Sequence, residues 1–305
     1  MNLKPNLQET HLVIGIDGLI GNALRDFLLQ SGKKVIGTTR RKEFVSSQNI
    51  FLDLSQNVRM WKPEQPVSVA YFCAGITSLE QCRIHPEKSL KINVEHTFEV
   101  IETLVAQGAF VLFPSTNLVY DGSSSFQNAQ QQPTPHTISG QHKAEIEKKL
   151  LAIGNSVSIV RITKVFGSSD PLLQNWIARL KHNQEIFPFL DKVVSPLYLP
   201  FVVQTFYQIA HKRLLGITQI SGERDITYAD LAYRLAQKLG VNSTLVRPIP
   251  VQQSGLSFEN NPLHTTLDCT RLISELNVHL SVWEAVDLII KDNLLFFEGN
   301  QYAKS

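Results

Sequence analysis

Gly15, Gly18 and Gly21 follow one another at intervals of three where the first apolar run of this chain passes into its first helical pattern. The run HLVIGI begins at His11, and the following GLIGNALRDFLLQSG carries apolar residues at helical spacing. Glycine permits a tight turn and lets the backbone approach a pyrophosphate, while the helix start supplies N–H donors and a positive dipole end. A plain turn is the alternative, but the strand–turn–helix context favours a dinucleotide-binding loop. The loop residues expected at the ligand are Gly15, Asp17, Gly18, Leu19, Ile20 and Gly21.

Strand patterns and helical patterns alternate through the first half of the chain. This alternation implies right-handed crossovers and an α/β fold with a doubly wound parallel sheet of the Rossmann type. Because the segments shorten after Gly167, we expect a nucleotide-binding domain over residues 1–167. A smaller C-terminal α/β substrate lobe is expected over 168–305, with some segments returning to the sheet. The expected strands cover 11–16, 33–39, 49–54, 67–75, 109–116 and 156–162, and the expected helices include 86–107 and 137–152.

Composition excludes several classes of protein. With 43% hydrophobic and 18% charged residues among 305, the chain can bury a core and is not mainly disordered. A net charge of +2 gives no argument for a nucleic-acid partner. No apolar run reaches the roughly 18 residues of a membrane helix, and the start lacks the apolar core of a secretion signal. Three scattered cysteines fit reduced thiols, so we expect a cytoplasmic protein without a metal site.

The end of the second strand indicates which dinucleotide the chain prefers. An acidic residue there usually accepts from a free ribose 2′-hydroxyl, whereas arginine suits a 2′-phosphate. Here Thr39, Arg40 and Arg41 follow one another without an acid, which favours NADP over NAD, with Arg40 as the preferred contact. The alternative is a solvated basic loop. Because a carboxylate would repel a phosphate, the Asp17 side chain is expected to point away from the diphosphate.

Several further motifs resemble the extended short-chain dehydrogenase/reductase superfamily, and in particular its dTDP-4-dehydrorhamnose reductase-like, sugar-nucleotide-binding branch. They are the glycine loop, Asp53-Leu54, Cys73-Ala74-Gly75, Asn93-Val94 and the segment FPSTNLVYDG. The resemblance covers nearly the whole chain. It implies that Asp53 and Leu54 lie near the adenine, and that Cys73, Ala74 and Gly75 lie beside the cofactor. It also implies that Asn93 is a helix-kinking or structural residue near the site.

The resemblance also implies a catalytic group, in which one residue departs from the family pattern. Thr116 matches the catalytic hydroxyl at the end of the fifth strand, and Lys143 matches the lysine of Tyr-x-x-x-Lys, which holds the nicotinamide ribose of the cofactor in the family. The tyrosine position holds Ser139. The i,i+4 spacing still places Ser139 and Lys143 on one helical face. A serine hydroxyl is a far weaker acid than a phenol, so the usual proton transfer is impaired.

Three explanations of this departure stay open. In the first, another group supplies the proton, and His136 or Tyr120 is better placed for this than His142. In the second, a water held by Ser139 and Thr116 relays the proton. In the third, catalysis is lost and cofactor binding remains. The main hypothesis is an NAD(P)-dependent oxidoreductase or epimerase acting on a nucleotide-linked keto sugar. The alternatives are a non-catalytic, regulatory NADP-binding protein, and a reductase of another small carbonyl compound. We expect a small-molecule partner, no nucleic acid and no membrane; a homodimer is left open.

Overall fold

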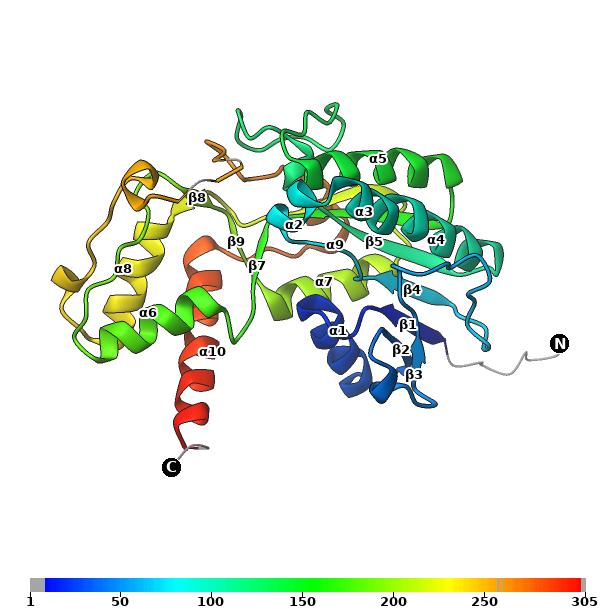
Figure 1. The fold of residues 1–305 in the computed structure, drawn as a ribbon, viewed down its shortest axis with the longest axis horizontal. Coiled ribbons are helices and arrows are strands. Elements are labelled where there is room, and N and C mark those ends of the chain that lie inside the picture. The colour runs from blue at the N-terminus through cyan, green and yellow to red at the C-terminus, as the bar shows by residue number, and fades with distance from the viewer. Residues whose placement is uncertain (1–8, 257, 260, 303–305) are drawn as a thin grey trace. The chain divides into compact units, whose positions relative to one another are not determined.

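The computed structural model describes residues 9–256, 258–259 and 261–302. Its largest sheet has seven strands in the order β10-β6-β5-β4-β1-β2-β3, and the neighbouring strands with an assigned register run parallel. Figure 1 labels the strands β1 to β5 of this sheet. The expected α/β fold with a parallel, helix-flanked sheet is therefore confirmed. The strand β10 was not among the six expected strands. The strand bounds are β1 Thr10–Ile14, β2 Lys34–Thr39, β3 Asn49–Phe51, β4 Val69–Phe72, β5 Phe110–Thr116, β6 Val157–Ile162 and β10 Gly216–Ile220.

The register of the central strands places several predicted site residues at one edge of the sheet. Both β1 and β4 are buried along their whole length, as expected of parallel strands covered on both faces. Ile14, the last residue of β1, pairs with Thr38 in β2 and with Phe72 in β4. The loops that begin at Gly15 and Cys73 therefore leave the sheet side by side.

The helices follow the expected positions, with one interruption. Instead of a single helix over 86–107, the chain forms α3 Pro86–Leu90, a π-helical turn Lys91–His96 and α4 Thr97–Ala106, in direct succession. The expected long helix is therefore present from Pro86 to Ala106, and its irregular turn contains Asn93, for which a helix-kinking or structural role was implied. The other helices of this region are α1 Leu19–Gln30, α2 Leu79–Ile84 and α5 Ile138–Ile153.

The chain forms two compact units, each built from separate stretches. The first unit runs to Val119 and also contains Pro133–Arg161 and Val203–Thr218; the second contains Tyr120–Gln132, Ile162–Val202 and the chain from Gln219 onward. The first unit holds most of the seven-stranded sheet, and its core includes Leu12, Phe72 and Val111. The compact units are interleaved along the chain, and Val203–Thr218, which is part of the expected C-terminal lobe, belongs to the first unit. Part of α7 Leu199–His211 belongs to the first unit.

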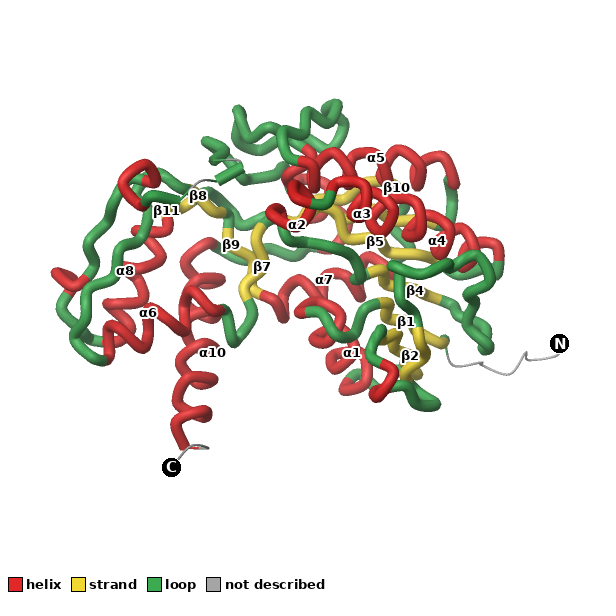
Figure 2. Tube along the Cα trace, viewed as in Figure 1, coloured by secondary structure: helices red, strands yellow, loops and turns green. Residues whose placement is uncertain are grey.

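The second unit is mainly helical, with short strand pairs (Figure 2). Its core includes Trp176, Leu235 and Ile289, which come from the three helices α6, α8 and α10. Among the described residues, no helix combines the length and the apolar character needed to cross a bilayer. The bounds in this region are β7 Lys164–Phe166, α6 Pro171–Lys181, β8 Val193–Val194, β9 Pro196–Tyr198, β11 Ile226–Thr227, α8 Tyr228–Leu239, α9 Thr270–Leu276 and α10 Val282–Tyr302.

Candidate functional site

A cavity of about 580 Å³ lies in the first unit, at the carboxyl ends of β1, β2 and β4. We call it the loop cavity. Ligands of doubly wound sheets bind at this edge. Nine of the residues expected at the ligand line it: Gly15, Asp17, Gly18, Arg40, Asp53, Leu54, Cys73, Ala74 and Gly75. The lining residues do not include five others for which a cofactor contact was expected, namely Leu19, Ile20, Gly21, Thr39 and Lys143.

The three loop glycines are needed for different reasons. Gly15 has φ +87°, and a Cβ there would lie 2.9 Å from the Ala74 backbone. A Cβ on Gly21 would lie 2.2 Å from the Gly15 carbonyl oxygen, so both glycines are required by protein packing. Gly18 has ordinary extended geometry, and its Cβ would come no closer than 3.5 Å to any protein atom. The bare backbone at Gly18 therefore leaves room for a ligand in the loop cavity.

The start of α1 fits an anionic group. Gly18 is the N-cap and offers no side-chain acceptor to the first N–H groups of the helix. Unpaired N–H groups at a helix start, with the positive end of the helix dipole, favour phosphate. Two hydrogen bonds to Thr38 in β2 fix the loop. Thr38 Oγ1 accepts from the Gly15 N–H at 3.0 Å, and the Thr38 carbonyl accepts from the Ile16 N–H at 3.1 Å. The loop therefore has a fixed backbone, and the start of α1 is suited to an anionic group.

The end of β2 brings two arginines and one carboxylate to the cavity. Arg40 and Arg41 are both exposed and both line it. Asp17 accepts a hydrogen bond from Thr39 Oγ1 at 2.8 Å, and Arg41 Nε lies 3.9 Å from its other oxygen. Thr39 is buried, and its hydroxyl holds the Asp17 carboxylate in place. Its neighbour Thr38 lines the cavity. The alternating directions of strand side chains explain why these two threonines differ.

Asp53 forms a fixed negative group on the same cavity. It accepts from the Ser55 N–H at 2.9 Å, the Ser55 hydroxyl at 2.8 Å and Gln56 Nε2 at 3.1 Å. Burial opposes its ionisation, but these hydrogen bonds and the charge of Arg40 together hold the pKa of Asp53 below its usual value. Asp53 is therefore a charged, oriented acceptor on the cavity wall.

The π-helical turn positions the loop after β4. Asn93 lies in this turn; its Oδ1 accepts from the Ile76 N–H at 2.8 Å, and its Nδ2 donates to the Ile76 carbonyl at 2.9 Å. Gly75 has φ +150°, and a Cβ on it would lie 3.0 Å from Asn93 Oδ1. Asn93 thus clamps a loop that lines the cavity. Cys73 is a neutral lining group, because burial raises the pKa of its thiol to about 12.

The three expected catalytic residues lie near the end of β5 and the start of α5, outside the loop cavity lining. Thr116 is half-buried, and its Oγ1 accepts from the Leu118 N–H at 3.2 Å. Ser139 is buried, and among the described residues its hydroxyl has no hydrogen-bond partner. Lys143 Nζ donates to the Pro114 carbonyl at 2.8 Å, and burial lowers its pKa to about 8 against the attraction of Glu147.

The residues considered as substitute proton donors differ in availability. His136 is exposed. The Tyr120 hydroxyl, within the second unit, donates its proton to the Asn128 carbonyl at 2.6 Å, and Tyr120 is only 3% exposed. His142 is buried, its Nδ1 has no partner within the described chain, and burial lowers its pKa. The tyrosine proton is thus already engaged, and His142 stays neutral at physiological pH.

A buried ion pair near this group was missed by the sequence analysis. Arg161 Nη2 lies 2.6 Å from Glu147 Oε2, both side chains are 2% exposed, and Ser115 Oγ donates to the same carboxylate. Glu147 is one turn after Lys143, and Ser115 precedes Thr116. The pair therefore links α5 to β6, and the hydrogen bond from Ser115 links the same carboxylate to β5. Its signal in the sequence was a charged residue, Arg161, inside the apolar run SVSIVRI.

Eight residues that line the cavity were not predicted from the sequence. Four of them lie in β2 or follow β3 and β4, namely Thr38, Leu52, Ser55 and Ile76, and the other four come from the helical region after β4, namely Gln81, His85, Lys88 and Ile92. Gln81 lies in α2, His85 between α2 and α3, Lys88 in α3 and Ile92 in the π-helical turn. Lys88 adds a positive side chain to the cavity.

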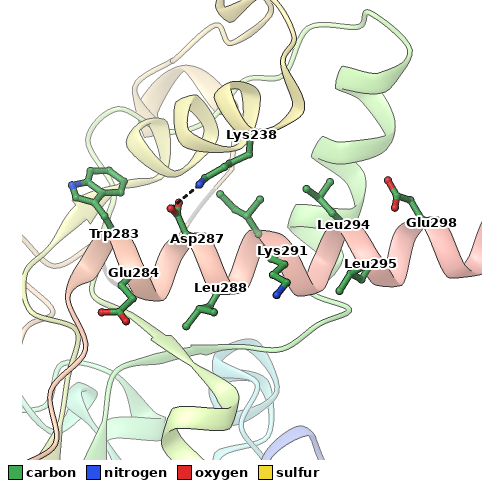
Figure 3. Close-up of a pocket in the computed structure, with 10 residues that line it drawn as sticks. Lys238, Trp283, Glu284, Asp287, Leu288, Lys291, Leu294, Leu295 and Glu298 are labelled. Carbon is green, nitrogen blue, oxygen red and sulfur yellow. Dashed lines mark ion pairs between the residues drawn. The ribbon is translucent and has the colours of Figure 1, made fainter.

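A larger cavity of about 790 Å³ lies in the second unit along α10 (Figure 3). In it Asp287 pairs with Lys238 at 2.7 Å and with Arg234 at 2.6 Å, next to apolar residues such as Leu294. None of the predicted site residues lines it, and its carboxylate is already neutralised by two cations. The loop cavity, although smaller, is therefore the candidate functional site.

Comparison with known proteins agrees with this geometry. The chain is 25% identical over 279 residues to methionine adenosyltransferase 2 subunit beta of Bos taurus, covering 86% of this chain and 80% of that protein. It is 23% identical over 287 residues to dTDP-4-dehydrorhamnose reductase of Aggregatibacter actinomycetemcomitans, covering 90% and 95%. The fold matches the dTDP-4-dehydrorhamnose reductase of Bacillus anthracis, solved in complex with NADP, with a TM-score of 0.78 at 19% identity, covering 97% and 100%. The family described as RmlD substrate binding domain matches residues 10–294. The chain, with its glycine loop and seven-stranded sheet, belongs to that family.

Proposed function

We propose that the protein is an NADP-dependent oxidoreductase or epimerase that acts on a nucleotide-linked keto sugar. The observation that carries the proposal is the loop cavity, where the bare Gly18 backbone and the start of α1 form a diphosphate cradle. Arg40 lines the same cavity and suits a 2′-phosphate. The reductase of Bacillus anthracis, whose fold is similar, was solved with NADP. A cytoplasmic location and a homodimer remain predictions from the sequence.

In this proposal the chain's own groups bind, orient and move a proton. The Thr116 hydroxyl donates to the substrate oxygen, and Lys143 exchanges its bond to the Pro114 carbonyl for one to the cofactor ribose. Ser139, whose hydroxyl has no partner among the described residues, holds a water with Thr116. This water passes a proton to the substrate oxygen and is reprotonated from solvent. The bound dinucleotide supplies the hydride chemistry.

Binding and turnover test the proposal in sequence. Calorimetry of ligand-free protein with NADPH should give a measurable binding heat, and NADPH oxidation should then be followed with a panel of keto-sugar nucleotides. Replacing Lys143 by alanine should lower turnover because the ribose is no longer held. Turnover unchanged by Lys143→Ala would remove the role assigned to this lysine, and the absence of any binding heat would refute the proposal itself.

A non-catalytic, regulatory NADP-binding protein is the second candidate. Two observations favour it: Ser139 stands where the family carries tyrosine, and one of the relatives is named as the beta subunit of methionine adenosyltransferase 2. It predicts dinucleotide binding with no turnover on any sugar nucleotide, and no effect of changing Thr116.

Ser139→Tyr separates the two candidates. General acid–base catalysis typically contributes 10²- to 10⁴-fold, so restoring the phenol one turn before Lys143 should create or raise reductase activity if the rest of the site is intact. The measurement is NADPH oxidation by the variant and the native protein side by side. A variant that binds NADPH normally but stays inactive with the whole panel supports the regulatory candidate.

A further inference from the structure

Asp17 occupies an unusual place for a carboxylate, inside a loop that we propose holds a diphosphate. Its side chain reaches from the glycine loop to the end of β2, where Oδ2 accepts from Thr39 Oγ1 at 2.8 Å. It lines the loop cavity and is 23% exposed. The carboxylate is therefore held at the end of β2 and still faces the ligand space.

The end of β2 is where a doubly wound fold meets the adenosine ribose. An acidic residue there accepts a hydrogen bond from the ribose 2′-hydroxyl, and arginine accommodates a 2′-phosphate. The strand's own end supplies Thr39, Arg40 and Arg41, and no acid. Asp17 places an acid at this position from a different element. The chain thus carries both kinds of recognition group.

Asp17 has acceptor capacity left for a ligand. An ionised carboxylate offers about four lone-pair sites. Thr39 uses one, and Arg41 Nε at 3.9 Å is too distant to form a hydrogen bond. The remaining sites are free for a ribose hydroxyl, which can donate to them from the cavity.

The two arginines are not equivalent. Arg41 pairs with Asp17, and its guanidinium lies 5.5 Å from the Phe44 ring. Arg40 lines the cavity and, within the described part of the chain, makes no ion pair shorter than 4 Å. Arg40 is therefore the guanidinium available to a 2′-phosphate, while Arg41 offsets the charge of Asp17 beside it.

We propose that Asp17 is a specificity-determining residue that lets the loop cavity accept NAD as well as NADP. Asp17 accepts from the free 2′-hydroxyl of NAD, and Arg40 binds the 2′-phosphate of NADP. The carboxylate repels that phosphate and so limits the preference for NADP. This inference rests on the proposed function, because it assigns the dinucleotide selectivity of the same cavity.

Dissociation constants for NADH and NADPH, measured by fluorescence titration, test the inference without any need for turnover. In the native protein both dinucleotides should bind, with Kd values within roughly tenfold of each other. Asp17→Asn retains an amide oxygen for Thr39 and removes the charge. It should weaken NADH and tighten NADPH, so that the ratio of the two Kd values shifts about tenfold toward NADPH. Arg40→Ala should shift the ratio in the opposite direction by weakening NADPH alone.

The control is Asp26→Asn, which removes one carboxylate from α1 outside the cavity lining and should leave the ratio unchanged. Asp17→Ser serves as a second variant, with circular dichroism to verify folding of each protein. Adenosine 2′,5′-bisphosphate and adenosine 5′-monophosphate, used as competitors, should show the same shift. If both dinucleotides bind and neither Asp17 variant moves the ratio more than twofold, the inference is overturned. Failure of the native protein to bind either dinucleotide overturns the proposed function instead.

Discussion

Lys143 is the residue whose charge state matters most for the proposed chemistry. Its amine is enclosed between the Pro114 carbonyl and the Phe113 ring, whose centroid lies 4.2 Å from Nζ. Burial lowers the pKa of Lys143 to about 8, so the amine loses its proton within reach of physiological pH. A lysine with a depressed pKa can act as a titratable group rather than as a fixed cation.

Dinucleotide affinity should therefore depend on pH through Lys143. As pH rises through about 8, the positive charge near the bound ribose and phosphates is lost, and NADPH should bind up to roughly tenfold more weakly by about pH 9.5. The measurement is NADPH fluorescence titration across this range. Lys143→Met should bind more weakly at neutral pH and show a flat profile. An equally steep fall in the methionine variant would assign the pH dependence to another group.

Single positions also show how far the sequence alone could predict this site. The turn between β1 and α1 at Gly15, Gly18 and Gly21 was accessible because glycine spacing reports backbone geometry directly. It was not accessible from the sequence whether Thr38 or Thr39 lines the cavity, because the register of a buried strand decides which side chain faces it. The partner of Arg161 was not accessible either, since Glu147 is 14 residues away on a different element.

Among the elements, the junction between α5 and β6 depends on the buried pair of Glu147 and Arg161. Glu147→Gln leaves the Arg161 guanidinium buried without a counter-charge. It also weakens the hydrogen bond that the side chain at position 147 accepts from Ser115. Removing one partner of a buried ion pair typically destabilises a protein by about 3–5 kcal/mol. We therefore expect a loss of this order in the free energy of unfolding, measured by urea denaturation.

The matched control for this prediction is Glu145→Gln, an exposed carboxylate on the same helix. It should change the free energy of unfolding by no more than about 0.5 kcal/mol. If Glu147→Gln were as mild as this control, the ion pair would not be what holds α5 on β6.

Elements were better predicted than their irregularities. Six strands of the sheet were expected from apolar runs, because parallel strands buried on both faces are nearly continuous in hydrophobic residues. A helix-kinking or structural role was implied for Asn93, but the π-helical form of the turn Lys91–His96 and the bonds of Asn93 to Ile76, 17 positions earlier in the chain, were not predicted. Helical periodicity carries no information about a contact at that distance in sequence.

At the scale of the whole molecule, acid should destabilise the fold through a buried histidine at the start of β1. His11 is 2% exposed, its Nε2 has no partner among the described residues, and Tyr71 Oη lies 3.4 Å from its Nδ1. Burial lowers the pKa of His11; Glu9 opposes the shift, and Lys33 and His211 add to it.

The direction of the pH effect follows from this shift. The unfolded chain takes up a proton near pH 6.5, and the folded chain does so only at lower pH. The stability contributed by neutral His11 is therefore present above about pH 6.5 and is lost as pH falls through the lower, folded pKa. Thermal melting from pH 8 to pH 5 should show a smaller fall for His11→Phe than for the native protein. Parallel melting curves would assign the acid sensitivity to other groups.

The interleaving of the two compact units has a consequence for biosynthesis. The first unit contains Val203–Thr218, so a ribosome must translate more than two thirds of the message before the first unit can fold completely. A fragment ending near residue 167 would lack this stretch and expose the apolar surface it covers. Chaperone capture of nascent chains should therefore persist until about residue 218 has left the exit tunnel, and neither unit can be obtained by simple truncation of the gene.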